Sequence, residues 1–414
     1  MTQKTTIIGG GVIGLAIAYY LAEQGVSVRL IDQKTIGSSC ALGSAGYVSP
    51  SHFIPLAAPG MVKKGLKWMF DPESPFYIHP RLDMKLLSWL WLFNRHCTEK
   101  HVSNVKRALL SLCLESRELY VALNQELNKP IDLVEKGVYV LCQTDKGMTH
   151  EREVLADANQ LGLKASEVSR ETLADRYPSM DFNIAGSVYF PEDAHVQPGH
   201  LIESLYHSLK SKGVELVENC EVTRIECHGN TVSKVISHDN EYHVEQLVMA
   251  AGSWSSQLGQ QLKLSIPVQA GKGYSLTLDN PWELDTPMIL SEGAVAITPF
   301  GKQIRFGGTM EFSGINLGIN PRRVKGILKS VSRFFNDFDW TTVDISESWA
   351  GLRPCSPDGL PMIGHCNQFE NLIVATGHAM LGVTLAPVTG KIVCDLITGK
   401  QGRVRPEIDV RRFV

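Results

Sequence analysis

The chain has 414 residues, of which 43% are hydrophobic and 20% are charged, and its formal net charge at pH 7 is −3. This length exceeds a single compact core and predicts two domains, and the balanced charge argues against nucleic acid as a partner. No run reaches the ~18 apolar residues of a membrane-spanning helix. The nine scattered cysteines include no C-x-x-C pair, which favours reduced thiols and a cytoplasmic location. His and Cys show no zinc-ligand spacing, so we expect no metal site.

The first 32 residues predict a nucleotide-binding unit. Thr5–Ile8 and Val26–Ile31 are predicted as strands and Leu15–Gln24 as the helix between them. The turn after the first strand has G-x-G-x-x-G spacing, with glycines at Gly9, Gly11 and Gly14. Such glycines make a tight turn, admit a pyrophosphate close to the backbone and let helix and strand pack closely, while the helix N-terminus attracts phosphate. Asp32 lies 18 residues after Gly14, at the end of the second predicted strand, where a carboxylate binds a ribose diol.

Beyond this unit, the expected elements alternate in character. A loop rich in small residues (37–51) and a basic, aromatic stretch (61–70) come first. The helices expected next are 84–96, 104–128, 151–162, 199–212 and 386–397, and the strands are 137–143, 187–190, 214–217, 221–226, 245–250, 273–278, 295–298, 303–307 and 372–375. This order predicts an α/β fold with two interleaved domains. We assign residues 1–80, 186–263 and 346–414 to a Rossmann-like nucleotide-binding domain, and residues 81–185 and 264–345 to an α+β substrate-binding domain.

Three further segments suit a dinucleotide site. The loop Ser39–Pro50 has small residues that let a flat ring lie against the backbone, although a flexible surface loop has the same composition. Leu247–Trp254 is a strand that ends in a small-residue turn. Near the C-terminus, Gly351–Gly364 contains the sequence G-L-R-P, and Ala375–Pro387 places a glycine-containing turn before the last helix.

Together with the first turn, these segments resemble the D-amino-acid oxidase/dehydrogenase superfamily of FAD enzymes over nearly the whole chain. The resemblance implies an FAD-binding Rossmann-like domain interleaved with a substrate-binding domain of the D-amino-acid oxidase type. Val222, expected in the strand 221–226, would contact adenine through its main chain, and it is equally a core valine. Cys355 does not match the cysteine tether of relatives with covalent flavin, so we expect non-covalent FAD. The residues implied in FAD binding are Gly9, Gly11, Val12, Ile13, Gly14, Asp32, Gln33, Ser39, Cys40, Gly43, Ser44, Ala45, Gly46, Val222, Ala251, Gly252, Trp254, Gly351, Arg353, Gly377, His378, Met380, Leu381, Gly382, Val383 and Thr384.

Three residues are candidates for the chemistry of the substrate. The resemblance gives Arg353 the role of gripping the substrate carboxylate, which a planar guanidinium binds in bidentate fashion. A structural salt bridge is the alternative. Tyr274 is a candidate partner of the carboxylate or amine, and it is as well explained as a core or surface tyrosine. His378 is either a contact of the flavin ring or a turn residue bonded to the backbone.

Within the superfamily, Lys67–Phe70, Ser74–Phe76 and Trp89–Phe93 resemble segments of bacterial D-amino-acid dehydrogenases and D-hydroxyproline dehydrogenases. This resemblance implies oxidative deamination of a D-amino acid by hydride transfer from the α-carbon to flavin N5, giving an imine and a 2-oxo acid. The electrons would pass to a quinone or another acceptor. We expect D-proline or cis-4-hydroxy-D-proline as the favoured substrate, because no acidic residue in these motifs selects a cationic side chain and the candidate pocket walls are apolar or aromatic: Phe53, Tyr274, Met288 and Trp349.

The expected partners follow from the same features. The basic stretch Lys63–Phe70 is interpreted either as a peripheral contact with the inner face of the membrane or, more simply, as a lid or packing segment. A homo-oligomer or a partner subunit is left open. Two other functions stay as alternatives: a glycine- or sarcosine-type oxidase that uses oxygen, and a non-catalytic flavoprotein or electron-transfer subunit.

Overall fold

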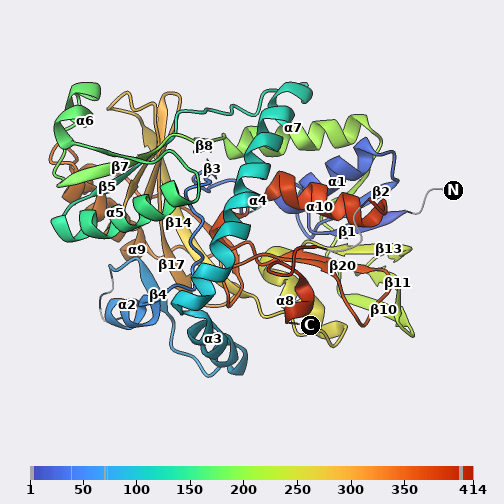
Figure 1. The fold of residues 1–414 in the computed structure, drawn as a ribbon. Helices are drawn as coiled ribbons and strands as arrows, with labels where there is room; N and C mark the ends of the chain where they lie inside the picture. Colours follow the sequence, from blue (N-terminus) through green and yellow to red (C-terminus); the bar gives the residue numbers. More distant parts are fainter. Residues whose placement is uncertain (1–3, 39, 70, 72, 401–403, 414) are drawn as a thin grey trace.

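The computed structural model describes residues 4–38, 40–69, 71, 73–400 and 404–413. Two large β-sheets of different topology organise these residues. One sheet and its helices form the right-hand half of Figure 1, where both termini lie, and the other sheet forms the left-hand half. The long helix α4 (Glu99–Glu126) runs between the two halves.

The first sheet has six strands and contains the predicted nucleotide-binding unit. Neighbouring strands are parallel except at one edge, where β19 is antiparallel to β20. Helix α1 (Val12–Glu23) packs against α7 (Pro198–Ser211) and α10 (Ala386–Ile397). In sheet order the strands are β19 (Met362–His365), β20 (Leu372–Thr376), β13 (Gln246–Met249), β1 (Thr5–Ile8), β2 (Val28–Ile31) and β9 (Glu215–Val217). The strands β1 and β13 are neighbours, and the strands that follow them in this sheet lie on opposite sides: β2 beside β1, and β20 beside β13. In α/β sheets, ligands bind at the carboxyl ends of the strands at such a point.

The second sheet has nine strands and is mainly antiparallel. Its parallel pairs are β15 with β5 and β17 with β4. In sheet order the strands are β18 (Trp349–Cys355), β14 (Gln269–Asp279), β17 (Gln303–Phe312), β16 (Val295–Phe300), β15 (Met288–Leu290), β5 (Val138–Cys142), β7 (Gly186–Phe190) and β6 (Ser166–Val168), with β4 (Phe76–Ile78) beside β17. Because side chains alternate between the faces of a strand, one face forms a core with helix α9 while the other is free to line a site.

The remaining elements are short and peripheral. The helices are α2 (Met61–Trp68), α3 (Met84–His96), α5 (Asp145–Gln160), α6 (Arg170–Arg176), α8 (Ser255–Gln261) and α9 (Pro321–Phe334). Two small sheets pair β3 (Tyr47–Val48) with β8 (Ala194–His195), and β10 (Arg224–His228) with β11 (Thr231–Ile236) and β12 (Glu241–His243). Short 3-10 turns are η1 (Gly252–Trp254), η2 (Trp340–Thr342), η3 (Ala379–Leu381) and η4 (Val410–Arg412).

The sheets correct the predicted domain boundaries in part. Strands β4, β7 and β18 pair in the nine-stranded sheet, although the boundaries placed their residues with the nucleotide-binding domain. Conversely, α4 contributes Leu109, Leu112 and Tyr120 to the core around the six-stranded sheet. The physical reason is that a strand pairs, and a helix packs, with residues that are distant in sequence. Local sequence does not reveal these partners. Apart from these elements, the two-domain division stays a prediction.

Candidate active site

A cavity of about 1250 Å³ is lined by residues of both large sheets. Its lining includes Gly9, Asp32 and Ala250, which follow the carboxyl ends of β1, β2 and β13, and it reaches Arg353 on β18. This volume exceeds the ~300–1,000 Å³ of an ordinary small-molecule pocket. The cavity is therefore large enough for an extended cofactor together with a small substrate.

The first glycine turn leaves no room for side chains. Gly9 has a φ of +113°, and a Cβ there would stand 2.4 Å from the carbonyl oxygen of Ala250. A Cβ at Gly14 would stand 1.8 Å from the carbonyl oxygen of Gly9, so Gly14 fixes the turn without lining the cavity. Gly11 begins α1 with no side-chain cap. The first N–H groups of the helix thus remain for an anionic ligand such as a pyrophosphate.

Asp32, which directly follows the neighbouring strand β2, also lines the cavity. Its Oδ2 accepts the N–H of Gly10 at 2.6 Å, and its Oδ1 accepts the N–H of Lys34 at 2.8 Å. Burial raises the pKa of Asp32, and these two hydrogen bonds oppose that rise. A carboxylate has about four acceptor sites, so Asp32 retains acceptors for a ribose diol, as predicted from its position.

The loop after Asp32 is anchored to the nine-stranded sheet. The guanidinium of Arg305 donates to the carbonyl oxygens of Leu42 at 2.9 Å and Ser44 at 2.8 Å, and Ser275 Oγ donates to Gly43 O at 2.7 Å. Burial lowers the pKa of Arg305 to about 10. These contacts exclude the alternative of a flexible surface loop. Of the predicted loop residues, Ser39 lies outside the described residues, and Cys40, Gly43, Ser44, Ala45 and Gly46 line the cavity.

Two predicted cofactor glycines have an additional role. A Cβ at Gly43 or Gly351 would stand only 2.2 or 2.0 Å from the ring of Trp349. Both glycines therefore admit the indole of Trp349, which itself lines the cavity. The ring of Trp349 therefore requires glycine at both positions, whether or not the backbone there also contacts a cofactor.

The remaining predicted turns converge on the same cavity. Val222 lines it, but β10 begins only at Arg224, so the strand expected at 221–226 starts too early. Gly377 has a φ of +79° and shapes its turn without lining the cavity. Thr384 Oγ1 donates to the carbonyl oxygen of Tyr47 at 2.8 Å and so ties the C-terminal turn to the anchored loop. The other lining residues from the predicted set are Val12, Ile13, Gln33, Ala251, Gly252, Trp254, His378, Met380, Leu381, Gly382 and Val383.

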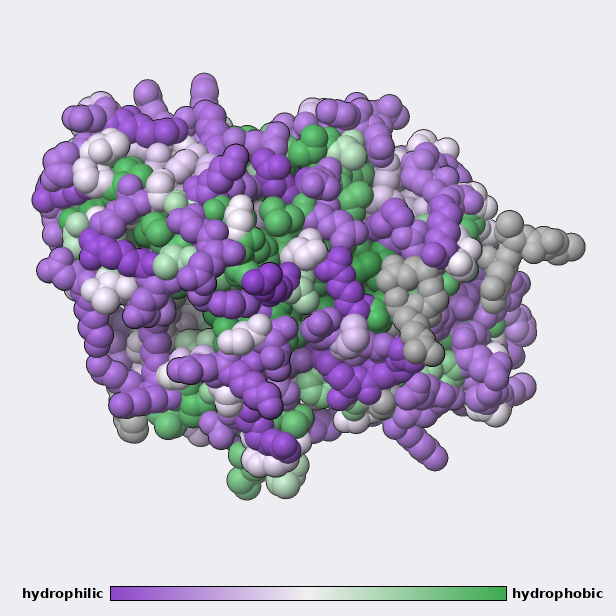
Figure 2. Space-filling view, in the orientation of Figure 1, coloured by the Kyte–Doolittle hydropathy of each residue, from purple (hydrophilic) through white to green (hydrophobic). Residues whose placement is uncertain are grey.

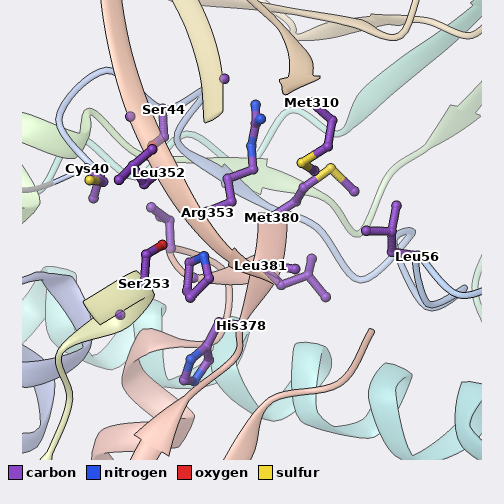
Figure 3. A pocket seen from close by; sticks show the side chains of 18 of the residues that line it. Cys40, Ser44, Leu56, Ser253, Met310, Leu352, Arg353, His378, Met380 and Leu381 are labelled. Carbon is purple, nitrogen blue, oxygen red and sulfur yellow. The ribbon is translucent and has the colours of Figure 1, made fainter. Parts of the chain in front are cut away.

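Arg353 presents a guanidinium to the cavity without an acidic partner. Figure 3 shows its side chain extending from the strand toward Met310. Nη1 donates to the carbonyl oxygen of Thr309 at 2.6 Å, and among the described residues no carboxylate forms an ion pair with Arg353. Burial lowers its pKa. The structural salt bridge considered as an alternative is therefore absent, and the fork of N–H donors is free to bind an anion.

Thr309 occupies a strained position beside this guanidinium. Thr309 and Met310 of β17 face the single residue Gly273 of β14, which makes a β-bulge. Thr309 has a φ of +69°, a conformation that a β-branched residue rarely adopts. The bulge places the Thr309 carbonyl on Arg353, while Gly273 leaves room for the guanidinium. Strain of this kind is typical of functional sites.

Two predicted catalytic side chains have other partners. Tyr274 donates its hydroxyl to Glu311 Oε2 at 2.8 Å, so it offers no free donor to a substrate, which agrees with the alternative of a core tyrosine. The His378 ring is turned away from Arg353, toward the helices (Figure 3). Its Nε2 lies 3.0 Å from Thr389 Oγ1 of α10, and burial lowers its pKa to about 3. His378 is thus a neutral residue bonded to the last helix, and because it also lines the cavity, a contact with the flavin stays a prediction.

Two of the four residues predicted as pocket walls line the cavity. Tyr274 and Trp349 line the cavity, whereas Phe53 and Met288 are fully buried in separate cores. The error at Met288 has a simple cause, because its neighbour Ile289 on β15 faces the cavity and the pleat turns Met288 to the other side. Glu151 of α5 lines the cavity too, and its Oε1 accepts the hydroxyl of Ser291 at 2.7 Å.

Comparison with known proteins identifies the class. Residues 4–396 match the family described as DAO, FAD dependent oxidoreductase. The chain belongs to this family, and FAD is its cofactor. The cradle at Gly9–Gly14, the free acceptors of Asp32 and the anchored loop fit this group. The predicted superfamily, fold class and cofactor are confirmed.

Individual relatives match the chain over nearly its whole length. It is 30% identical to the D-amino acid dehydrogenase of Neisseria meningitidis serogroup C / serotype 2a (strain FAM18) over 414 residues, which cover 98% of each protein. It is also 30% identical to the D-amino acid dehydrogenase of Vibrio vulnificus (strain YJ016), over 99% of this chain and 100% of the relative. The crystal structure of glycine oxidase from Geobacillus kaustophilus has a similar fold, with a TM-score of 0.80, 23% identity and full coverage of both chains.

Sequence reasoning missed several residues that shape the cavity. Arg305, Thr309 and Gly273 act through partners on other strands, and their sequence neighbourhoods contain no motif. One signal was present, because the pair Gly307-Gly308 before Thr309 interrupts a strand pattern and indicates a bulge.

Proposed function

We propose that the chain oxidises D-amino acids by FAD-dependent dehydrogenation, with the substrate carboxylate held by Arg353. The observation that supports this proposal is an unpaired guanidinium, directed into a mainly apolar cavity that also contains the FAD-binding turns. Bound FAD would accept a hydride from the α-carbon. The protein supplies placement: Arg353 fixes the carboxylate in a bidentate grip and so orients the α-carbon. In this proposal the FAD is bound non-covalently.

The proposed substrate is a D-amino acid with a compact apolar side chain, and D-proline or cis-4-hydroxy-D-proline is favoured. The lining near the bulge supports this choice, because Met310, Tyr274 and Trp349 are apolar or aromatic. A rigid ring also loses little freedom on binding. Glu151 is the residue that would favour a cationic side chain instead, and its position on α5 makes it the place to test that alternative.

The proposed electron acceptor is a quinone or another carrier. No helix among the described residues is long and apolar enough to span a membrane. However, α3 and the loop before it expose Leu82, Met84, Leu87 and Trp91, whose exposed fractions are 106%, 79%, 51% and 57%. The lower edge of the molecule, where α3 lies in Figure 1, is coloured green in Figure 2. The neighbouring α2 contains Lys63, Lys64 and Lys67, and Met61, Lys64 and Leu66 of α2 line the cavity. This combination suits a lipophilic acceptor and a peripheral contact with an anionic membrane.

The test is a panel of amines mixed anaerobically with the purified holoenzyme, with flavin bleaching as the readout. We expect D-amino acids to bleach the flavin and L-amino acids, glycine and sarcosine to do so much more slowly. Bleaching by glycine or sarcosine alone would favour the oxidase alternative, as would hydrogen peroxide released in proportion to turnover. If no amine bleaches the flavin, the non-catalytic flavoprotein or electron-transfer subunit is the better description.

A further inference from the structure

Behind the anchored loop, a buried carboxyl group has no basic partner. Asp193, in the turn between β7 and β8, is 1% exposed. Its Oδ1 accepts the backbone N–H of Ser51 at 2.9 Å, and its Oδ2 accepts the hydroxyl of Ser51 at 2.6 Å. Among the described residues, no Lys, Arg or His forms an ion pair with it. A buried charge without a partner is costly, so this carboxyl group requires an explanation.

The same serine connects the carboxyl group to the cavity. Ser51 Oγ lies 3.3 Å from Nδ1 of His52, and His52 lines the cavity that Arg353 also lines. His52 lies next to the C-terminal turn, because its N–H donates to Ser49 O at 3.1 Å and Ser49 N in turn approaches Thr384 Oγ1 at 3.4 Å. The order from the cavity inward is therefore His52, Ser51, Asp193.

The donors fix the state of the imidazole. While Asp193 is ionised, the single hydroxyl proton of Ser51 is directed at its carboxylate, so Ser51 Oγ accepts from His52 and the imidazole proton lies on Nδ1. Nε2 then has its lone pair free, and no described residue donates to it. A neutral imidazole with a free lone pair, facing a substrate cavity, has the form of a general base.

We propose that His52 is the base that takes the ammonium proton of the substrate, and that Ser51 and Asp193 are positioning residues that pass this proton inward. The inference rests on the proposed function, which supplies an α-amino acid as the substrate. The substrate N–H bond breaks and its proton joins His52 Nε2, while the electron pair stays on the substrate nitrogen. The Nδ1 proton moves to Ser51 Oγ, and the Ser51 proton moves to Asp193 Oδ2.

This step leaves a neutral amine, a neutral imidazole and a neutral Asp193 carboxyl group, so the proton transfer creates no new buried charge. The hydride transfer that follows uses only the bound FAD. After the product leaves, water that enters the cavity recovers the proton through His52 by the reverse path. Burial raises the pKa of Asp193 to about 7, which makes its carboxylate a better proton acceptor than an ordinary one. Burial lowers the pKa of His52 to about 4, so His52 passes the proton inward and does not retain it. The other titratable groups near Asp193 are Glu192 in its own turn, Cys113 on α4 and Tyr47 on β3.

The first test measures the pH dependence of anaerobic flavin reduction by the best D-amino acid. We expect His52→Gln to slow reduction at pH 7 by roughly 100-fold, the typical contribution of a general base. Ser51→Ala and Asp193→Asn should move the pH profile to higher pH, whereas Ser51→Thr retains a hydroxyl and should keep the wild-type profile. The exposed serine variant Ser211→Ala is the control, with no expected change. FAD content and melting temperature verify folding in each case.

The second test does not depend on activity. Nitrogen NMR of labelled histidine in the wild-type holoenzyme, with His52 assigned by its loss in His52→Gln, should show the neutral Nδ1–H tautomer above pH 8, where Asp193 is ionised. Ser51→Ala should shift that resonance. A His52 protonated on Nε2, or a Ser51→Ala variant with an unchanged pH profile, would overturn the relay while leaving the proposed function intact. If no amino acid reduces the wild-type flavin, the proposed function fails, and the relay fails with it even where the tautomer is as expected.

Discussion

Gly273→Ala is the sharpest available test of Arg353 as the carboxylate anchor, because it leaves the arginine in place. Gly273 has an ordinary backbone conformation, so an alanine there is not strained by its own φ. Its Cβ, however, would stand 2.3 Å from Nη1 and 2.4 Å from Cζ and Nη2 of Arg353. An ordinary contact begins near 3.4 Å, and the guanidinium would therefore have to move by about 1.1 Å.

A shift of this size would weaken or break the 2.6 Å hydrogen bond to Thr309 and displace the carboxylate of a bound substrate. A misplacement of about 1 Å in a positioned group can reduce the rate by roughly 100-fold, which corresponds to about 2.7 kcal/mol. The free energy of unfolding should change far less, since replacing glycine by alanine reduces the freedom of the unfolded chain by ~0.4–1 kcal/mol. We expect the loss mainly in the apparent affinity for the substrate.

The assay is stopped-flow reduction of the flavin at several substrate concentrations, with FAD content and melting temperature measured alongside. Two variants serve as comparisons. Gly307→Ala adds a methyl group to the same cavity wall, but its nearest contact would be 3.8 Å away. Gly199→Ala on α7 meets nothing within 4 Å. If Gly273→Ala reduces its flavin as efficiently as these variants, the guanidinium is not the group that positions the substrate.

Three further predictions follow from the site. Arg353→Lys should raise KM and lower kcat/KM by ~2 kcal/mol or more, because a point charge does not reproduce a bidentate grip; steady-state kinetics would show it. Glu151→Gln should leave turnover of D-proline unchanged. If D-arginine is the best substrate and its turnover falls strongly in this variant, the apolar pocket is contradicted. Stability should fall by about 3 kcal/mol in total as the pH drops from 6.5 to 5, measured by urea unfolding. Toward pH 5 the unfolded chain holds about three histidine protons that the folded chain lacks, whereas the folded chain holds one proton on Asp193, whose pKa is raised to about 7. The histidines, whose pKa burial lowers to about 4, 4 and 3, are His52, His195 and His378.

The sequence predicted the cofactor side of the site better than the substrate side, and the reason is physical. The glycine turn and Asp32 act through a strand, a turn and a helix that are adjacent in sequence, so local spacing determines their geometry. Most of the predicted FAD-contact residues among those described do line the cavity. The exceptions, Gly14 and Gly377, shape turns that the cofactor residues depend on.

The substrate side is built from strands far apart in sequence, and local patterns do not determine it. Arg353 was identified from a motif, but its partner Thr309 depends on a bulge between β14 and β17. Tyr274 was placed on the correct strand, yet its hydroxyl bonds with Glu311, which only the cross-strand register brings near. Met288 was misplaced because a one-residue difference in a strand reverses the face.

This division has a consequence for how the fold accommodates different substrates. The turn Gly9–Gly14 tolerates little change, because a Cβ at Gly9 or Gly14 would collide with backbone atoms. The substrate wall is made of β-strand positions whose side chains alternate toward the cavity, and each is replaceable without disturbing the turn beneath the cofactor. Arg305 bridges the two parts by holding the loop carbonyls of Leu42 and Ser44. A change in substrate preference should therefore arise at wall positions such as Ile289 and Met310, whereas a change at Arg305 should disturb cofactor and substrate binding together.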